Sequence, residues 1–430
     1  MKKRITAWAL ALAMLSALVI GALADEQTAA DRPAAAAASA DTSGTLHFED
    51  LNARIRSGSY TILSLEETIA MIESIDYERV ESDLRDALNS IAESQWQMTA
   101  SMNGLSSLIP DPATGSVVGQ LGSMVGTMGS QSLQSTYSSL KDQFDAVRDG
   151  DLQEDNAALV RQLRNAEDTA VMMGQSLYVT LLDLEAQSAA LARQGAALDR
   201  SIAEMELRYQ LGQISAMTLE QVKTGKTQLE SGKATLDVNI AALRRQLNAM
   251  TGAELTASLT LTGLTEVTAE QLAAMDLEKD LEKAKAASYT LFDAKKTLDD
   301  ADDTYRDDAN YYGYNESNYR FQQVKHTWQA AQYTYNAAVQ SYELSFRSLY
   351  ESVKDSAQIL NAAQTALAVK RADLQTAQTK YDQGAISENA LHTAEDDLYA
   401  AQDTVTGAAH DLFTAYNNYC WAVEYGLINS

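Results

Sequence analysis

The amino-acid sequence predicts an all-α protein made of two tandem repeats, each a very long coiled-coil helical hairpin. Three observations support this fold class. The same turn sequence occurs twice, apolar residues recur every seven positions on both sides of each copy, and no proline occurs from Ala113 to Ser430. Because proline breaks helices while glycine and serine end and start them, this combination is typical of long helices that turn back on themselves.

The repeated turn reads Arg-Tyr-Gln-Leu-Gly-Gln-Ile-Ser at 208–215 and Lys-Tyr-Asp-Gln-Gly-Ala-Ile-Ser at 380–387. In each copy the glycine stands where a helix C-terminus needs a left-handed residue, and the serine suits the N-cap of the next helix. An efficient turn between two helices explains those two positions. It does not explain why a basic residue, a tyrosine and an isoleucine recur with them.

Apolar residues with a period of seven flank both turns, and this period predicts left-handed coiled-coil packing. Around the first turn they are Leu177, Leu184, Leu191, Leu198 and Met205, then Val222, Leu229, Leu236, Leu243 and Met250. Around the second they are Val339, Phe346, Val353, Leu360, Leu367, Leu374 and Tyr381, then Leu391, Leu398, Val405, Leu412 and Tyr419. Ala394, Ala401, Ala408, Ala415 and Ala422 form a parallel row. A helix over 320–383 would be roughly 95 Å long, so we expect hairpins to associate laterally.

The chain divides into four predicted segments. Residues 1–24 resemble a signal peptide, with a basic start, an apolar run and a small-residue cleavage site, so the protein is expected to be exported. Residues 25–45 form a linker rich in alanine, serine and threonine. Repeat 1 is expected over 46–262 and repeat 2 over 263–430.

Charge and composition exclude several classes of function. The formal net charge of −26 argues against nucleic acid as a partner, and it suits either a solvated helical surface or a wet, acidic lumen. Cys420 is the only cysteine, and the four histidines have no metal-ligand spacing. No catalytic motif is present. We therefore predict that the chain is not an enzyme, with no cofactor and no metal site.

At the two glycine turns the sequence resembles the TolC-type outer-membrane efflux ducts, which carry the same internal duplication. Leu243 through Gly252 (LRRQLNAMTG) and Leu398 through Gln402 (LYAAQ) resemble helix segments of that family. Leu65 through Ile69 resembles the start of its first repeat, and Leu281 through Ala301 the start of its second. The likeness covers most of residues 60–425.

The resemblance implies a homotrimer in which each chain contributes two repeats to a hollow α-helical barrel. It also implies two further partners, a membrane-fusion adaptor protein that docks at the glycine turns and an inner-membrane pump that supplies the energy. The docking residues carried over from the family are Arg208, Tyr209, Leu211, Gly212, Ile214, Ser215, Lys380, Tyr381, Gln383, Gly384, Ile386 and Ser387. The chain itself would be a passive export channel.

Two departures from the family bear on this function. The family inserts two β-strands per repeat, whereas Asp307 through Arg320 is too short for two membrane-crossing strands and about 104–130 is a glycine-rich segment, read as a flexible loop or as a membrane-associating element. Strand insertions are therefore predicted to be reduced or absent, and membrane insertion is left open. Near the second turn, Glu388, Glu395 and Asp396 form either an acidic ring at the channel entrance or a solvated helix face.

An aromatic cluster, Tyr311, Tyr312, Tyr314, Tyr319 and Trp328, has three interpretations. It is a packed turn, an interfacial belt, or a surface that contacts carbohydrate or cell wall. The function expected from the whole sequence is a TolC-like envelope duct of an efflux or secretion system. The alternative is a structural coiled-coil protein of the cell envelope that has no channel activity.

Overall fold

The structure, a computed structural model, describes residues 44–107 and 134–428 and, within them, the side chains of all but residues 98–107. The predicted signal peptide, nearly all of the predicted linker and residues 108–130 of the predicted glycine-rich segment lie outside these residues. The chain forms two compact units. Among the described residues, the first comprises Glu67–Arg161, and the second combines the chain up to Glu66 with Gln162 onward.

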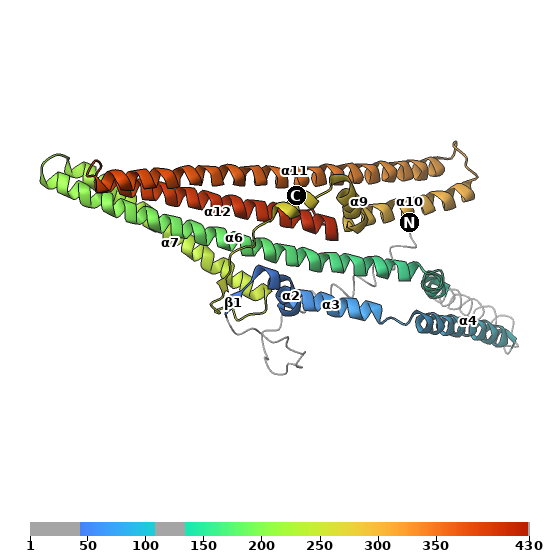
Figure 1. Ribbon diagram of the computed structural model, residues 1–430. Helices are drawn as coiled ribbons and strands as arrows, with labels where there is room; N and C mark the ends of the chain where they lie inside the picture. Colours follow the sequence, from blue (N-terminus) through green and yellow to red (C-terminus); the bar gives the residue numbers. More distant parts are fainter. Residues whose placement is uncertain (1–43, 108–133, 429–430) are drawn as a thin grey trace. The chain divides into compact units, whose positions relative to one another are not determined.

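Long helices dominate the described residues, so the predicted all-α class is confirmed (Figure 1). The elements in order are β1 (Thr45–Leu46), α2 (Phe48–Gly58), α3 (Tyr60–Glu73), α4 (Tyr77–Ser107), α6 (Asp151–Gln210), α7 (Ala216–Met250), β2 (Thr260–Leu261), α8 (Ala269–Ala274), α9 (Leu277–Ala287), α10 (Tyr289–Tyr312), α11 (Tyr319–Asp382) and α12 (Glu388–Tyr425). Residues 134–148 are also helical.

Two long hairpins, α6 with α7 and α11 with α12, turn at the two predicted glycines (Figure 1). The helix expected over 320–383 is α11, which begins at Tyr319 and ends at Asp382. Within the second hairpin the heptad residues Phe346 and Val353 of α11 are fully buried, whereas Leu374, closer to the turn, is only half-buried. The apolar rows therefore form a core that is densest away from the turn.

The other end of each hairpin, which we call its base, is closed by a pair of short helices with the same geometry in both repeats. Ser59 joins α2 to α3, and Ser288 joins α9 to α10; each is buried and extended, with backbone angles of φ −76°, ψ 117° and φ −62°, ψ 121°. Their amides donate to Ile55 and Ala284 respectively, at 2.9 and 3.0 Å. Thus the duplication extends beyond the turns to the bases.

One buried tyrosine hydroxyl ties together the backbone at each base. The Tyr178 hydroxyl of α6 lies 2.8 Å from the carbonyl oxygen of Leu46 and 2.9 Å from the amide nitrogen of Thr262, which donates to it. The Tyr342 hydroxyl of α11 lies 3.1 Å from the carbonyl oxygens of both Ala284 and Gly426. Buried backbone groups need hydrogen-bonding partners. At each base one tyrosine hydroxyl is such a partner for carbonyl oxygens in loops or at helix ends.

A two-stranded parallel sheet closes the base of repeat 1. Thr45 pairs with Thr260 and Leu46 with Leu261, so the start and the end of this repeat lie side by side. The sequence had placed Thr45 in the linker, whereas the structure places it in β1. A two-residue strand has no periodic pattern from which it could have been predicted.

The segments where the resembled family inserts strands are helical in the described residues. In repeat 2, α10 continues to Tyr312 and α11 begins at Tyr319, so the predicted shortening of Asp307–Arg320 leaves only a tight turn, in which Gly313 has φ 65°. In repeat 1, α4 continues through Ser107, into the segment predicted to be a loop from about 104. No proline lies between Pro33 and Pro110, so no proline interrupts the helix in this stretch.

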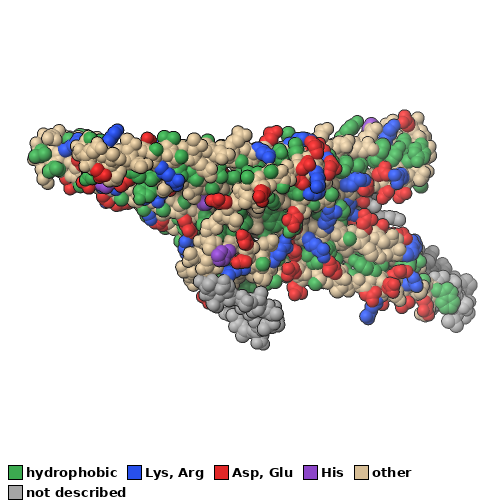
Figure 2. All heavy atoms as spheres, in the orientation of Figure 1, with side chains coloured by type: hydrophobic (Ala, Val, Ile, Leu, Met, Phe, Trp, Pro, Cys, Tyr) green, Lys and Arg blue, Asp and Glu red, His purple; other side chains and the backbone are tan. Residues whose placement is uncertain are grey.

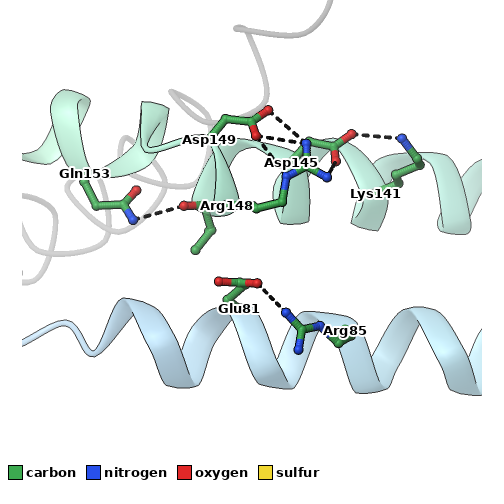
Figure 3. Close-up of polar contacts among 8 residues, drawn as sticks. Glu81, Arg85, Lys141, Asp145, Arg148, Asp149 and Gln153 are labelled. Carbon is green, nitrogen blue, oxygen red and sulfur yellow. Dashed lines mark hydrogen bonds and ion pairs between the residues drawn. The ribbon is translucent and has the colours of Figure 1, made fainter.

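Charged side chains of the first unit, Glu67–Arg161, form several ion pairs (Figure 3), and two of the arginines also contact an aromatic ring. The guanidinium groups of Arg85 and Arg148 each lie 5.7 Å from the centroid of the Phe144 ring. Arg85 also pairs with Glu81 at 2.5 Å, and Arg148 with Asp145 at 3.0 Å. Cations over an aromatic face contribute about 0.5–1 kcal/mol each when exposed, so this cluster stabilises the unit only modestly.

Candidate functional site: the two hairpin tips

The first tip, residues 208–215, ends α6 with a Schellman turn. Gly212 has φ 71°, and its amide donates to the carbonyl oxygen of Tyr209 at 2.9 Å. The next amide, of Gln213, donates to the carbonyl oxygen of Arg208 at 2.8 Å. Ser215 then caps α7, because its hydroxyl accepts from the amide of Thr218 at 3.2 Å. The sequence-predicted roles of this glycine and serine are confirmed.

The second tip, residues 380–387, repeats this geometry bond for bond. Gly384 has φ 69° and donates to Tyr381 at 2.8 Å, and the amide of Ala385 donates to Lys380 at 2.8 Å. The Ser387 hydroxyl accepts from the amide of Ala390 at 3.3 Å. The recurring basic residue and tyrosine therefore supply only backbone oxygens to the turn, which any residue could provide.

The side chains at the tips divide into one that packs and several that face solvent. Ile214 and Ile386 are half-buried beneath their turns, which gives the recurring isoleucine a packing role. The basic residues and tyrosines are exposed in both copies: Arg208, Tyr209, Lys380 and Tyr381. Because the turn itself does not use these exposed side chains, they are available for a binding partner.

The two tips share a backbone but differ in polarity. Exposed Leu207, Leu211 and Met217 of the first tip correspond to Thr379, Gln383 and Asn389 of the second. Leu211 is 64% exposed. The first tip thus presents an apolar surface and the second a polar one. This difference arises at positions where the two copies of the repeat have different residues.

One chain of contacts connects the two tips within the second unit. The Arg208 guanidinium pairs with Glu204, and the other carboxylate oxygen of Glu204 accepts from the side-chain Nδ2 of Asn389, two residues after Ser387. In contrast, Lys380 has no ion pair or side-chain hydrogen bond in the part of the chain that the structure describes. The candidate docking residues therefore lie at one end of the two hairpins.

The three acidic residues predicted at the entrance have different surroundings. Glu395 lies 2.8 Å from Nδ1 of His392, and Glu388 lies 3.7 Å from Nε2 of the same ring. Asp396 accepts from Arg200 of α6 at 2.9 and 2.6 Å, so its charge is already paired within the chain. Glu388 and Glu395 thus lie around one histidine, whereas Asp396 connects two helices.

Asp396 belongs to a polar ladder that sequence reasoning missed. Five polar residues of α12 recur every seven positions, and each contacts α6. They are Asn389, Asp396, Asp403, His410 and Asn417, and their partners are Glu204, Arg200, Arg193, Asp183 and Gln175. A polar row in phase with the apolar rows was visible in the sequence, but its partners lie in the other repeat, about 180–240 residues away, and no local pattern identifies them.

Ion pairs also connect the two helices of each hairpin. The Glu206 carboxylate, 2.8 Å from the Lys223 ammonium, raises the pKa of that lysine by hydrogen bonding and charge. In the second hairpin, Asp397, 2.7 Å from Lys370, likewise raises the pKa of its lysine. Both lysine side chains are 40% exposed, so these pairs fix helix register more than they add stability.

Metal-ligand clusters and membrane-spanning helices are both absent from the described residues. No group of three or more His, Cys, Asp or Glu side chains among them is arranged to hold a metal ion. None of their helices contains a stretch long and apolar enough to span a membrane. The ordered features at the tips are exposed side chains on a rigid turn, an arrangement suited to protein recognition.

No protein-family model matches the chain, and no curated protein matches it. Solved structures of bacterial channels do match it. The outer-membrane channel OprN is 11% identical, with 88% of this chain and 90% of that chain covered and a TM-score of 0.47. A crystal structure of CusC, described in terms of transmembrane channel formation, is 17% identical and covers 66% of this chain and 73% of its own, with a TM-score of 0.43. For the open state of the MtrE outer membrane channel of Neisseria gonorrhoeae, the identity is 14%, the coverages are 65% and 73%, and the TM-score is 0.39.

Sequence identities of 11%, 14% and 17% indicate a likeness of fold and support no statement about function. Two of the matched proteins are described as outer-membrane channels, and the third in terms of transmembrane channel formation. By fold, the chain is similar to these outer-membrane and transmembrane channels.

Proposed function

We propose that the chain is a TolC-like envelope duct of a multi-component efflux or secretion system. In this proposal three copies form a hollow helical barrel, an adaptor protein docks at the two tips, and an inner-membrane pump drives cargo through a passive channel. The observation that carries the proposal is the repetition of one rigid turn with exposed basic and aromatic side chains that the turn does not need.

Exposed apolar side chains along the hairpins support the association of several copies. Leu344, Ile359 and Val369 of α11 fall on one face of that helix and are all largely exposed in the single chain. Burying a large aliphatic side chain contributes about 1.5–3 kcal/mol, so covering this row would favour assembly substantially. A second copy of the chain, with the same hairpins, is the partner that fits a row of this length.

Within the proposed barrel, Glu388 and Glu395 are the carboxylates left to form an acidic entrance ring. Asp396 is paired with Arg200 and contributes less net charge. Among the described residues, Glu388 and Glu395 pair only with the ring of His392, and threefold symmetry would bring three copies of each carboxylate together, which favours cations at the mouth.

The helical end of repeat 2 favours a second candidate function. Since α10 and α11 meet in a tight turn without strands, a structural coiled-coil protein of the envelope would need nothing more at this end. Such a protein would keep the hairpins and lack the channel.

Imaging separates the two candidates. The purified chain from residue 25 onward, studied by light scattering and negative-stain microscopy with and without detergent, should form a trimeric hollow cylinder. Its length should be near 100 Å, because a helix of 64 residues extends about 96 Å. A monomer or an open, non-tubular bundle would contradict the duct and favour the structural protein.

Docking at the tips needs a separate test. Tyr209→Ala combined with Leu211→Gln should abolish export in cells that depend on this protein while leaving the cylinder intact, because both side chains are exposed and unused by the fold. Tyr333→Ala, which removes an exposed tyrosine of α11 far from either tip in the sequence, is the matched control. Equal loss of export in the control would remove the case for docking at the tips.

A further inference from the structure

The turn between α10 and α11 carries a group of tyrosines that the proposed function does not use. We call Tyr311, Tyr312, Tyr314 and Tyr319 the tyrosine cap. Tyr311, Tyr314 and Tyr319 are 81%, 58% and 70% exposed. Figure 2 shows hydrophobic side chains, a class that includes tyrosine, over this end of α10 and α11. Exposed aromatic rings grouped at one turn are unusual on a surface that is otherwise strongly charged.

A separate inner layer of aromatic residues already closes this end of the hairpin. Phe321 is buried, at 2% exposure, and lies 6.0 Å from the Tyr305 ring. Tyr305 in turn stacks on Trp328, with a centroid distance of 4.7 Å and an interplanar angle of 9°. The packed-turn interpretation is therefore correct for Trp328, but it leaves most of the surface of the cap unexplained.

The rings of the cap are held in fixed positions. Nε of Arg320 donates to the Tyr319 hydroxyl at 3.0 Å, and its guanidinium lies 5.9 Å from the centroid of the same ring. Tyr311 and Tyr312 contact edge to face, with centroids 4.9 Å apart. Tyr314 occupies the left-handed region at φ 56°, where a tyrosine costs about 1 kcal/mol or more relative to glycine. Ordering of this kind lowers the entropy lost when a ligand binds.

Hydrogen-bonding groups of the turn surround the rings. Asn315 and Asn318 use their side-chain oxygens to accept from the amides of Ser317 and Arg320, at 2.9 and 3.0 Å. Their amide NH₂ groups donate to no acceptor in the described part of the chain, and they lie within four residues of a cap tyrosine. The turn thus combines flat apolar rings with free donors, and the charges around it are mixed, because Glu316 pairs with Lys325 at 2.6 Å and Arg320 lies near Asp307 and Asp308 in the sequence.

These features match the chemistry of an uncharged sugar ring. A sugar presents an apolar face of C–H groups that stacks on an aromatic ring, and hydroxyl groups at its edge that bond to amides and tyrosine hydroxyls. The mixed charges form no basic patch, and this disfavours phosphate-rich or anionic-lipid partners. We propose that the tyrosine cap binds a neutral glycan strand, with Tyr311 and Tyr319 as stacking platforms and Asn315 and Asn318 as hydrogen-bond donors.

Binding of soluble oligosaccharides tests this proposal directly. Purified full-length protein is titrated with hexamers of glucose, of N-acetylglucosamine and of mannose, and binding is followed by calorimetry. At least one hexamer should bind saturably, and Tyr311→Ala combined with Tyr319→Ala should weaken binding about tenfold or more, the ratio expected from two lost ring contacts. Asn315→Ala should weaken it less, through the loss of one hydrogen bond.

Tyr333→Ala is the matched control, because Tyr333 lies on α11 outside the cap and is also largely exposed. Circular dichroism and light scattering confirm that each variant keeps its helices and its assembly. The proposal is wrong if no hexamer binds, or if the control weakens binding as much as the double substitution. It is also wrong if the cap substitutions change the assembly, which would mean that copies of the chain cover these rings. If no sugar binds and the double substitution instead abolishes binding to phosphatidylcholine vesicles, the cap is an interfacial belt.

Discussion

The base and the tip of each hairpin use a glycine in the same conformation for different reasons. At the bases Gly252 and Gly426 have φ 69° and 68°, and at the tips Gly212 and Gly384 have 71° and 69°. A Cβ added at Gly426 would lie 2.3 Å from the backbone of Ser288, whereas one added at Gly384 would meet nothing within 4 Å. The base glycine is therefore required by packing as well as conformation, and the tip glycine by conformation alone.

This difference separates the part of the molecule that stabilises the fold from the part available for binding. At the bases, helix ends contact helix ends and tyrosine hydroxyls satisfy buried carbonyls. At the tips, the turn is complete within its own backbone and most side chains are exposed. Substitutions at the base should thus change stability, while substitutions at the tip should change recognition.

The largest expected effect is that of alanine at a base glycine. Gly426→Ala should lower the free energy of unfolding by about 3 kcal/mol or more, because the left-handed conformation and the clash with Ser288 act together. Gly384→Ala, with open space around it, should cost only about 1–2 kcal/mol. Urea denaturation of both variants measures the difference. Equal losses of unfolding free energy would show that the backbone around Gly426 and Ser288 moves apart without a further loss of stability.

A smaller effect is expected for a buried hydroxyl at the base. Tyr342→Phe removes the group that lies 3.1 Å from two buried carbonyl oxygens, and it should cost about 1–3 kcal/mol of stability. Burial raises the pKa of this tyrosine to about 12, which agrees with an environment that excludes water. Tyr381→Phe at the second tip, measured by the same denaturation, should stay within about 0.5 kcal/mol of the parent. A neutral result at Tyr342 would mean that water replaces the hydroxyl.

The two bases should also differ in their response to pH. At the base of repeat 2, Asp280 is buried, which disfavours its charge, but the Asp276 amide, the Tyr419 hydroxyl and Lys283 hold its pKa below the ordinary value. In repeat 1, burial and the nearby Glu66 raise the pKa of Glu167.

The lowered pKa means that Asp280 stabilises the fold above its unfolded-state pKa, and this contribution disappears as the pH falls through its folded-state pKa. For Glu167 the sign is reversed, since its contribution is present only below the unfolded-state pKa and is lost as the pH rises through the folded-state pKa. At pH 7, Asp280→Asn should therefore destabilise the protein and Glu167→Gln should stabilise it. The Glu167 difference should shrink by about pH 4, whereas the Asp280 difference should shrink only nearer to about pH 2, because its folded-state pKa lies below the ordinary value; thermal unfolding at three pH values, about 7, 4 and 2, measures both. Differences that do not depend on pH would contradict both assignments.

The smallest effect is expected near the tips, in the polar ladder. The coupling energy of Arg200 with Asp396, from a double-mutant cycle with alanine, should be below about 1 kcal/mol because both side chains are more than a third exposed. It should fall further in 1 M NaCl. The pair Lys223 and Glu206, which lies within one hairpin, is the matched comparison. A coupling of several kcal/mol would show that the tips, like the bases, stabilise the fold.

The sequence predicted the hairpins because their determinants are local. The seven-residue period, the glycine that ends one helix and the serine that starts the next all act within a few turns of helix. The contacts of Gly58 with Gly252 and of Ser288 with Gly426, by contrast, depend on backbone approach between distant segments. No composition or period encodes such an approach, so the bases could not be predicted.

At the candidate site the sequence identified the right turns but treated them as equivalent. The sequence shows which residues the two tips share, and Leu211, whose counterpart is Gln383, is not among them. It also grouped Asp396 with Glu388 and Glu395 by proximity, although its partner Arg200 lies in the other repeat. Pairing across repeats is decided by tertiary packing, which one sequence does not reveal.

The common period of the rows on α12 has a consequence for how such a protein changes over evolutionary time. Apolar, alanine and polar rows all advance by seven residues, so inserting one heptad into each long helix of both hairpins restores every contact in phase. Each such insertion would move the tips about 10 Å from the bases without altering either end. The distance between the tips and the bases can thus change in discrete steps, and so match the spacing between the structures that the two ends contact.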